Sequence, residues 1–329
     1  MENRKARIAV VGSINMDLVV RCTQLPQPGQ TILALESLEI CGGKGANQAV
    51  AASRAGGQVV MIGRVGDDAF ADRLIGNLNH YQVSTQAVQT TEQCSSGVAI
   101  VAVERSGQNS IMVVPGANGC LSPDDVNQHQ TMITDSEVLL LQLEIPLDTV
   151  VESIRIAKTS RTRVVLDPAP APHDWQSLLR QVKDTVNMPN PIDLICPNET
   201  EAAELTGLPV GNLGEAEQAA RVLHAQGISN VVITLASQGS LLFDGQAAHH
   251  IPPFPITAVD TTAAGDAFAG ALGVRWSETK SLTEAIRFAN AAGAIAATRP
   301  GAQISLPSRE EIQEMLTAAA HSSNSRINP

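Results

Sequence analysis

Short apolar runs rich in β-branched residues alternate with amphipathic segments along nearly the whole chain of 329 residues. Six of these runs predict buried parallel strands: RIAVVG, VVMIGRVG, EVLLLQLE, RVVLDPA, DLICPNE and NVVITLAS. The segments between them predict helices over 45–55, 68–78, 147–158, 215–226 and 282–298. This βαβ rhythm predicts an α/β fold, in which a doubly wound and mainly parallel sheet is flanked by helices on both faces.

Two stretches interrupt this rhythm and predict β-hairpins. Residues 18–40 hold LVVRC, a PQPG turn and TILALESLEI, and residues 96–114 hold SGVAIVAV, an ERSGQ turn and NSIMVV. Their four strands would form a small sheet over the cleft, a lid, whose exposed apolar face predicts a homodimer formed through it. The chain is expected to form one domain over 1–329 into which these lid strands are inserted, with a loop and a short helix over 169–191 and a disordered tail over 321–329.

Composition argues against several classes of partner. A formal net charge of -11 with scattered basic residues disfavours binding to nucleic acid or to a membrane surface. No apolar run is long enough to span a bilayer, and the polar start MENRKARIAVVG lacks the apolar stretch of a signal peptide. The cysteines are odd in number, widely spaced and without a CxxC pair, which disfavours disulfides and zinc and favours a reducing cytoplasm.

Two glycine-rich turns lie far apart in the sequence, GGKGAN at 42–47 and DTTAAGD at 260–266, and each is followed by a predicted helix. A helix start bares N–H groups that attract anions, and glycine lets a ligand approach the backbone. Asp266 lies in the first turn of a helix that starts near Ala264, where the helix dipole favours its ionised form. Anion-binding amides beside a potential base suit phosphoryl transfer to a hydroxyl; in the alternative, Asp266 is an ordinary helix cap.

Polar residues at predicted strand ends suit the hydroxyls of a sugar. Asn15 and Asp17 follow the first strand, and Glu144 ends the strand EVLLLQLE, where doubly wound sheets place ligands. The first glycine-rich turn would form a second wall, with Gly42, Gly43, Lys44 and Asn47. The alternatives are solvated strand ends and a tight strand-to-helix connection. Neither GxxxxGK[ST] nor GxGxxG spacing is present, so neither a P-loop NTPase nor a Rossmann dehydrogenase is supported.

The motif PNETEA places Asn198 and Glu201 three residues apart at a helix start, so that both can face the same side. Such a pair could hold water-coordinated Mg²⁺, which keeps several waters and commonly takes one protein carboxylate plus substrate phosphates. The alternative is a capping box between the two residues, which can form at the same time.

Seven motifs in order resemble segments of the ribokinase-like family of carbohydrate kinases. They are GSINMD, GGKGANQAVAA, LLLQLE, PNETEA, TLASQG, VDTTAAGDAF and TRPGAQIS, and they span almost the whole chain. The resemblance implies an α/β core with a β-sheet lid and ATP-dependent phosphorylation of D-ribose at O5, giving D-ribose 5-phosphate and ADP. It also implies Mg²⁺ and activation by a monovalent cation, typically K⁺.

The same resemblance implies roles for individual residues. Asp266 would take the proton of the sugar hydroxyl, while an anion hole is made by the amides of Ala263, Ala264 and Gly265. The sugar-binding positions are Asn15, Asp17, Gly42, Gly43, Lys44, Asn47, Glu144 and Asp266. The nucleotide-binding positions are Asn198, Glu201, Thr234, Gly239, Gly265 and Asn290, with Glu201 reaching Mg²⁺ through water. The monovalent-cation loop comprises Asp260, Thr262, Ala296, Arg299, Gly301 and Ser305, with Arg299 contributing its carbonyl oxygen.

Two alternatives to a ribose kinase remain open. A kinase of deoxyribose, of another sugar or of a nucleoside would share the catalytic half, although an aromatic content of 2% argues against a nucleoside acceptor. A non-catalytic sugar-binding or regulatory protein could keep the fold without turnover. Such a binder would need neither Asp266 with its anion-binding turn nor the pair formed by Asn198 and Glu201.

Overall fold

Nine strands form one large sheet in the computed structural model of the chain, which describes residues 5–105 and 108–324. Their order is β13-β12-β11-β10-β9-β8-β1-β4-β5, and the pairings are parallel except where β12 and β13 join one edge. The strands are β1 (Arg7–Val11), β4 (Gln58–Gly66), β5 (Ser84–Thr91), β8 (Val138–Leu141), β9 (Arg163–Leu166), β10 (Ile192–Ile195), β11 (Ile228–Thr234), β12 (Ser240–Phe243) and β13 (Ala248–Ile251). The six predicted strands lie side by side, from β11 to β4, and the predicted fold class is confirmed.

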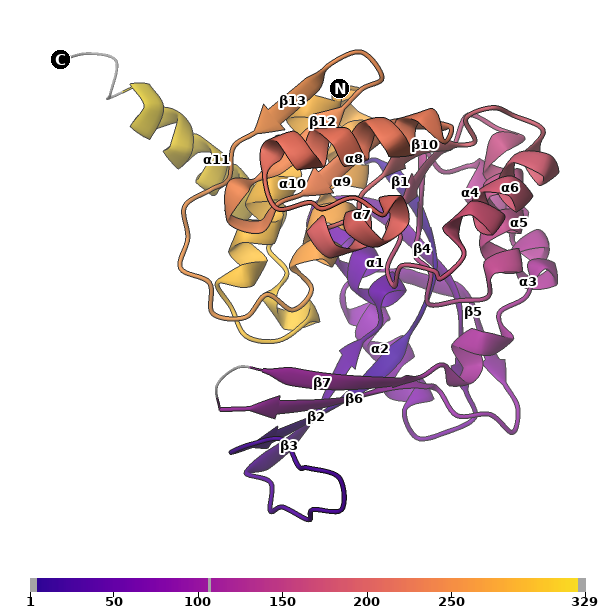
Figure 1. The fold of residues 1–329 in the computed structure, drawn as a ribbon. Coiled ribbons are helices and arrows are strands. Elements are labelled where there is room, and N and C mark those ends of the chain that lie inside the picture. Colours follow the sequence, from indigo (N-terminus) through magenta and orange to yellow (C-terminus); the bar gives the residue numbers. More distant parts are fainter. Residues whose placement is uncertain (1–4, 106–107, 325–329) are drawn as a thin grey trace.

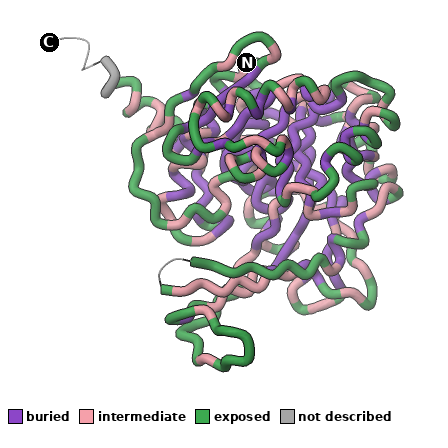
Figure 2. The backbone as a smooth tube through the Cα atoms, in the orientation of Figure 1, coloured by how far each residue is buried: buried purple, intermediate pink, exposed green. Residues whose placement is uncertain are grey.

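Helices cover both faces of this sheet because the central strands are apolar on both sides. In β1, Ile8 and Val10 join one buried cluster, and Ala9 and Val11 join the other. The helices that contribute to the first cluster are α1 (Lys44–Arg54), α2 (Ala71–His80), α9 (Ala264–Thr279), α10 (Leu282–Ala297) and α11 (Arg309–Asn324). Those that contribute to the second are α3 (Pro123–Gln128), α4 (Gln130–Thr134), α5 (Leu147–Lys158), α6 (Trp175–Val186), α7 (Glu199–Thr206) and α8 (Leu213–Ala225). Figure 2 shows the buried backbone in the interior of this larger body.

The predicted helices form within about three residues of their expected ends, as α1, α2, α5, α8 and α10. The segment 169–191, expected to be a loop with a short helix, contains the twelve-residue α6, whose Trp175 and Leu178 are buried in the second cluster. This segment therefore helps to cover the sheet. The tail expected to be disordered from residue 321 is still helical to Asn324, and residues 325–329 lie outside the described part of the chain.

A separate four-stranded sheet projects from the larger body at the bottom of the view in Figure 1. Its order is β3-β2-β6-β7, with β2 (Asn15–Cys22), β3 (Glu36–Gly42), β6 (Gly97–Glu104) and β7 (Asn109–Val114). The two hairpins join through a parallel pairing of β2 with β6. The first hairpin differs from its prediction, because β2 begins at Asn15 and β3 only at Glu36. The apolar segment TILAL thus lies in the connecting loop, where Leu33 is 92% exposed.

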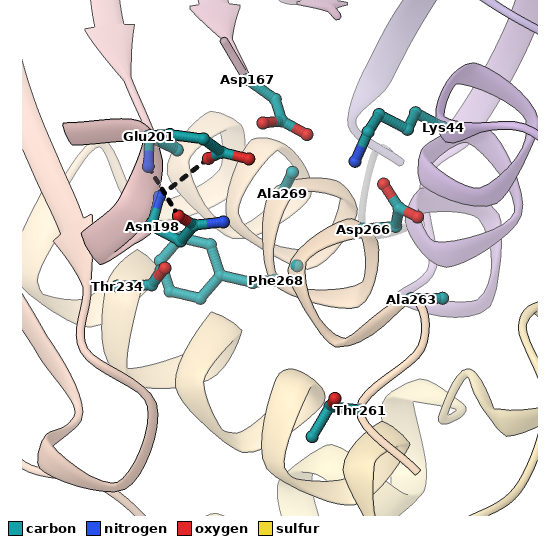
Figure 3. Close-up of a pocket in the computed structure, with 12 residues that line it drawn as sticks. Lys44, Asp167, Asn198, Glu201, Thr234, Thr261, Ala263, Asp266, Phe268 and Ala269 are labelled. Atoms are coloured by element: carbon teal, nitrogen blue, oxygen red, sulfur yellow. Dashed lines mark hydrogen bonds between the residues drawn. The ribbon is translucent and has the colours of Figure 1, made fainter. Parts of the chain in front are cut away.

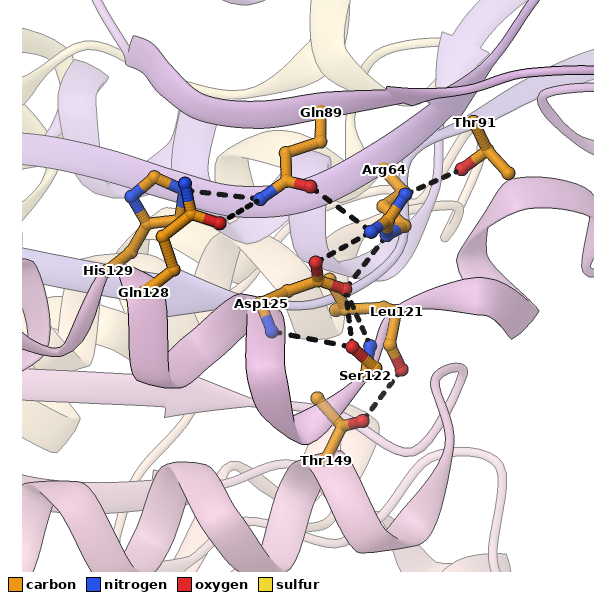
Figure 4. A network of polar contacts seen from close by, with 9 residues as sticks. All are labelled: Arg64, Gln89, Thr91, Leu121, Ser122, Asp125, Gln128, His129 and Thr149. Atoms are coloured by element: carbon orange, nitrogen blue, oxygen red, sulfur yellow. Dashed lines mark hydrogen bonds and ion pairs between the residues drawn. The ribbon is translucent and has the colours of Figure 1, made fainter.

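A polar network fixes the segment that follows β7 to the large sheet (Figure 4). Arg64 of β4 donates to both carboxylate oxygens of Asp125 at 2.8 and 2.6 Å, and Asp125 in turn forms a capping box with Ser122 at the start of α3. Thr149 of α5 donates its hydroxyl to the carbonyl oxygen of Leu121 at 2.7 Å. These bonds hold the chain between the lid and α3 in place. In the described ranges, no helix is long and apolar enough to cross a membrane.

Candidate active site

A pocket lies where the parallel strands end and where α1, α7 and α9 begin (Figure 3). Parallel strands direct their carboxyl ends to one edge of the sheet, and the helices that follow point their N-termini at the same place. The lining residues are Lys44, Asp167, Cys196, Asn198, Glu201, Thr234, Thr261, Ala263, Gly265, Asp266, Phe268 and Ala269. They come from both glycine-rich turns, which are distant in sequence, and from the strand ends between them.

Asp266 is held at the base of this pocket by two amide side chains of α1. Its Oδ2 accepts a hydrogen bond from Nδ2 of Asn47 at 2.9 Å, and its Oδ1 accepts one from Nε2 of Gln48 at 3.2 Å. The contact depends on a close approach of α1 to α9. Glycine at position 270 allows this approach, because a Cβ there would lie 2.6 Å from the Cβ of Ala51. The carboxylate near the far end of the chain is therefore in direct contact with groups from its first fifty residues.

The pKa of Asp266 is raised above its ordinary value, chiefly because the carboxylate is buried. The positive charge of Lys44 and the hydrogen bonds from Asn47 and Gln48 act in the opposite direction without reversing it. The helix start alone predicts a favoured ionised form, whereas in the folded chain burial shifts the pKa of Asp266 upward. A carboxylate with a raised pKa is a better proton acceptor at neutral pH than an ordinary aspartate.

Two further features of the α9 turn bear on anion binding. Ala263 adopts a left-handed backbone with φ of 57° directly before the helix, and a Cβ on Gly265 would meet no atom within 4 Å. The N–H of Ala264 donates to the carbonyl oxygen of Thr261 at 3.2 Å. Of the three amides expected to form the anion hole, Ala264 is therefore engaged within the turn, and Ala263 and Gly265 have no acceptor in the described ranges.

Lys44 lies among carboxylates in the same pocket. Burial alone would lower its pKa, but Asp167, Asp266, Glu144 and Glu201 raise it above the ordinary value, so the ammonium group stays charged. Asp167, which directly follows β9, has its pKa raised to about 8 by burial, although Lys44 lowers it. The site thus concentrates negative groups around one cation, an arrangement suited to ligands that bring positive charge or hydrogen-bond donors.

Asp17 and Glu144 lie on the side of the site nearest the lid. Glu144 accepts a hydrogen bond from the hydroxyl of Ser13 at 2.5 Å and one from the N–H of Lys44 at 3.3 Å. Burial, followed by repulsion from Glu144 and from Asp266, raises the pKa of Asp17 to about 7. The position of Asp17 also explains why residue 42 is a glycine, because a Cβ there would lie 2.2 Å from Oδ2 of Asp17. Asn15 and Asp17 follow β1 in the chain, as expected, and both belong to β2, one of the two inner strands of the small sheet.

Three buried polar residues at the site were not predicted from the sequence. Gln142 donates to Oε1 of Gln48 at 2.6 Å, and Gln48 donates to Asp167 at 2.8 Å as well as to Asp266. Asp167 could have been found, because it ends a predicted strand in the same way as Glu144. Gln48 and Gln142 carry no comparable signal, since only the packing of α1 against the sheet and α9 reveals their contact.

On the opposite side, Asn198 and Glu201 begin α7 and form the capping box that was the alternative reading. The N–H of Asn198 donates to Oε2 of Glu201, and the N–H of Glu201 donates to Oδ1 of Asn198, both at 2.9 Å. Both side chains line the pocket, as does Thr234 at the end of β11. Burial raises the pKa of Glu201, and the hydrogen bond from Asn198 opposes that shift.

Gly239 and Asn290 lie outside the set of described residues that line the pocket. Gly239 has φ of 85°, and a Cβ there would lie 2.3 Å from the carbonyl oxygen of Ile251, so the position requires glycine for packing. Asn290 of α10 accepts a hydrogen bond from the hydroxyl of Ser240 at 2.6 Å and donates to the carbonyl oxygen of Ile251 at 3.3 Å. Its amide therefore ties α10 to β12 and β13.

The predicted cation loop is closed by the carboxylate of Asp260. One oxygen accepts from the N–H and hydroxyl of Thr262 at 2.9 and 2.6 Å, and the other accepts from the N–H of Gly301 at 2.9 Å. Burial would raise the pKa of Asp260, but these bonds bring it below its ordinary value. The N–H groups of Val259 and Asp260 both donate to the carbonyl oxygen of Ala297, and the guanidinium of Arg299 pairs with Glu311. The two segments that hold the predicted ligands are thus in contact.

Fold and pocket together define an α/β protein of the kinase type, with a polar pocket at the carboxyl edge of its large sheet and a separate small sheet. The chain belongs to the pfkB family of carbohydrate kinases, whose family model matches residues 5–309. It is similar to a ribokinase from Haemophilus influenzae, with 40% identity over 312 residues that cover 95% of this chain and 99% of the relative. It is also similar to a deoxyribokinase from Salmonella typhi, with 37% identity over 310 residues that cover 94% and 98%.

Among solved structures, that of Arabidopsis thaliana ribokinase complexed with ribose and ATP matches with a TM-score of 0.84 and 33% identity, covering 95% of this chain and 99% of the other. The resemblance drawn from the motifs is therefore confirmed, and the chain is an ATP-dependent carbohydrate kinase.

Proposed function

We propose that this kinase transfers the γ-phosphoryl group of ATP to O5 of D-ribose, giving D-ribose 5-phosphate and ADP. The observation that carries the proposal is the contact of Asp266 with Asn47, which joins a buried base to a predicted sugar-binding side chain. Relatives named ribokinase, and one whose solved structure holds ribose and ATP, match over nearly the full length of the chain.

In this proposal Asp266 accepts the proton of the O5 hydroxyl as the oxygen attacks the γ-phosphorus. Its raised pKa favours that role near neutral pH, and the two amide donors from α1 fix the direction of its oxygens. The free N–H groups of Ala263 and Gly265 at the start of α9 stabilise the negative charge on the transferring group. The ammonium of Lys44 adds a fixed positive charge on the same side.

The residues on the ATP side fit a magnesium ion. Only Oε2 of Glu201 takes part in the capping box, so Oε1, which has no hydrogen bond in the described ranges, can accept one from a metal-bound water. Asn198, on the same helix turn, lines the pocket beside it. When bound, Mg²⁺ neutralises charge on the β- and γ-phosphates.

The loop closed by Asp260 fits a monovalent cation such as K⁺. Its carboxylate is held in the ionised form, and potassium sites in proteins are built largely from backbone carbonyl oxygens. The carbonyl oxygens of Thr262, Ala296, Arg299 and Gly301 and the side chain of Ser305 complete the proposed ligand set. This loop precedes the anion-binding turn of α9, so a bound cation would order that turn.

The lid supports the proposal of a homodimer. β7 is exposed along its whole length, and its apolar Ile111 and Met112 are 54% and 61% exposed. An apolar edge strand of this kind invites pairing with a second copy of the chain.

A deoxyribose kinase is the second candidate, because the deoxyribokinase from Salmonella typhi is 37% identical over 94% of this chain. The deciding experiment incubates the purified protein with ATP, Mg²⁺ and K⁺ and with D-ribose, 2-deoxy-D-ribose, D-fructose or nucleosides, and measures ADP. We expect the highest kcat/KM with D-ribose. A higher value with deoxyribose would favour the second candidate, and no ADP with any acceptor would favour a sugar-binding protein without turnover.

A further inference from the structure

Asn118 is buried at the root of the lid, next to Asn15. It lies in the short 3-10 helix η1 (Gly116–Cys120), just after β7, and is 2% exposed. Its side chain makes three buried hydrogen bonds. Oδ1 accepts from the N–H of Ile14 at 2.9 Å, while Nδ2 donates to the carbonyl oxygen of Ile14 at 3.2 Å and to Oδ1 of Asn15 at 2.7 Å.

The backbone of Ile14 determines which of the two side-chain atoms of Asn118 is the amide oxygen and which is the amide nitrogen. A backbone N–H can only donate a hydrogen bond, so Oδ1 of Asn118 must face the N–H of Ile14. A carbonyl oxygen can only accept one, so Nδ2 of Asn118 must face the carbonyl oxygen of Ile14. The same Nδ2 faces Asn15, and the atom of Asn15 opposite it must therefore be an acceptor. Consequently Asn15 directs Oδ1 toward Asn118, and its Nδ2 has no hydrogen-bond partner in the described ranges.

Gly97 of β6 makes this arrangement possible by leaving space for both amides. A Cβ at Gly97 would lie 2.1 Å from Nδ2 of Asn118 and 2.2 Å from Oδ1 of Asn15. In the register of the small sheet, Asn15 pairs with Gly97 of β6 on one side and with Gly42 of β3 on the other. The geometry of Asn15 is thus set by three strands and by η1 together.

Asn47 is oriented the other way from Asn15, with its amide oxygen rather than its amide nitrogen left without a partner among the described residues. One N–H of its Nδ2 donates to the carboxylate of Asp266 at 2.9 Å, which fixes the nitrogen on the side of Asp266 and turns Oδ1 the other way. That oxygen is buried and has no partner in the part of the chain described. An unpaired buried acceptor is costly, so a ligand group that donates a hydrogen bond to Asn47 is favoured.

We infer that Asn118 is a positioning residue that holds the Asn15 amide so that only its Nδ2 donor faces the sugar. The pentose is then recognised by one amide that donates, Asn15, and by one that accepts, Asn47. A hydroxyl at Asn15 acts as an acceptor, and a hydroxyl at Asn47 acts as a donor. This inference rests on the proposed function, because it takes the ligand to be a sugar.

The test is a double-mutant cycle of Asn118→Asp and Asn15→Ala, measured as kcat/KM for D-ribose. The carboxylate at position 118 still accepts from Ile14 but, when ionised, has no N–H for Asn15, whose amide is then free to turn. We expect kcat/KM to fall about 10- to 100-fold, mainly through a higher KM for D-ribose with the KM for ATP unchanged. With Asn15→Ala already present, the second substitution should change kcat/KM less than about 3-fold.

Thr149→Val is the matched structural control, because it removes one buried hydrogen bond to Leu121, directly beyond η1 (Figure 4). It should lower the Tm without raising the KM for D-ribose. If Asn118→Asp does not fold, Asn118→Ala takes its place in the cycle. A full effect in the Asn15→Ala background, or an equal rise in KM for Thr149→Val, would overturn the inference. A wild-type protein that does not phosphorylate D-ribose would instead refute the proposed function, and the inference with it.

Discussion

Replacing Asp17 by asparagine should stabilise the ligand-free protein at alkaline pH, although the same change weakens sugar binding. Burial and repulsion from Glu144 and Asp266 raise the pKa of Asp17 from 3.8 to about 7. Between these values the folded chain binds a proton that the unfolded chain has lost. The stability linked to Asp17 is therefore fully present below about pH 4 and is lost as the pH rises through about 7.

The magnitude follows from the size of this shift. A difference of about three pKa units corresponds to about 4 kcal/mol of unfolding free energy. That value is an upper bound, because Asp17 is only partly buried and its titration is coupled to neighbouring carboxylates. For Asp17→Asn we expect a gain of roughly 1–3 kcal/mol at pH 8, shrinking toward zero near pH 4.

Urea unfolding without ligand, at several pH values between these limits, measures the effect. Asp184→Asn, on the exposed face of α6, is the matched control, because it removes a surface carboxylate far from the cluster and should not give the gain of roughly 1–3 kcal/mol at pH 8. An Asp17→Asn variant that is no more stable than the wild type at pH 8 would refute the argument that the clustered carboxylates cost stability.

Three further predictions concern the site. Glu201→Gln should raise the KM for ATP and the Mg²⁺ concentration required for activity by about 10-fold. It should lower the free energy of unfolding in urea by at most about 1 kcal/mol, because glutamine can still cap α7. An unchanged Mg²⁺ dependence would show that Glu201 does not belong to the metal site. Gln48→Leu should lower kcat about 10- to 100-fold with little change in either KM, because Asp266 and Asp167 lose the amide donor that they share. Turnover at the wild-type rate would contradict a role of Gln48 in positioning Asp266. Replacing K⁺ by tetramethylammonium should lower kcat/KM in steady-state assays, and an unchanged rate would exclude a functional cation at Asp260.

Much of the fold could be predicted from the sequence because buried parallel strands are apolar on both faces and stand out as short runs. β5, with the sequence STQAVQTT, lacks that signature, and the short edge strands β12 and β13 are hidden among connecting segments. The sequence placed the start of β3 too early, because most of the apolar segment before it does not pair with β2, whose register with β3 covers only Glu36–Gly42. Strand pairing across a long loop is not visible in local composition.

The site was predicted less completely than the fold, for a related reason. Strand ends and glycine-rich turns point to Asp17, Glu144 and Asp266, but the direction of the pKa shift at Asp266 depends on burial by segments distant in sequence. Gln48 and Asn118 act through contacts between α1 and α9 and between η1 and β2. Such contacts arise only from tertiary packing, so they cannot be predicted from a local sequence pattern.

The most direct test of the proposed mechanism is kcat of the Asp266→Asn variant with D-ribose and ATP. Asparagine is nearly isosteric and cannot accept the hydroxyl proton, so kcat should fall about 10²- to 10⁴-fold. The variant should still fold, and its binding of ATP, measured by calorimetry, should stay close to that of the wild type, because asparagine keeps one of the two acceptor oxygens that face α1. Phosphorylation of D-ribose by Asp266→Asn at a rate near that of the wild type would contradict the account.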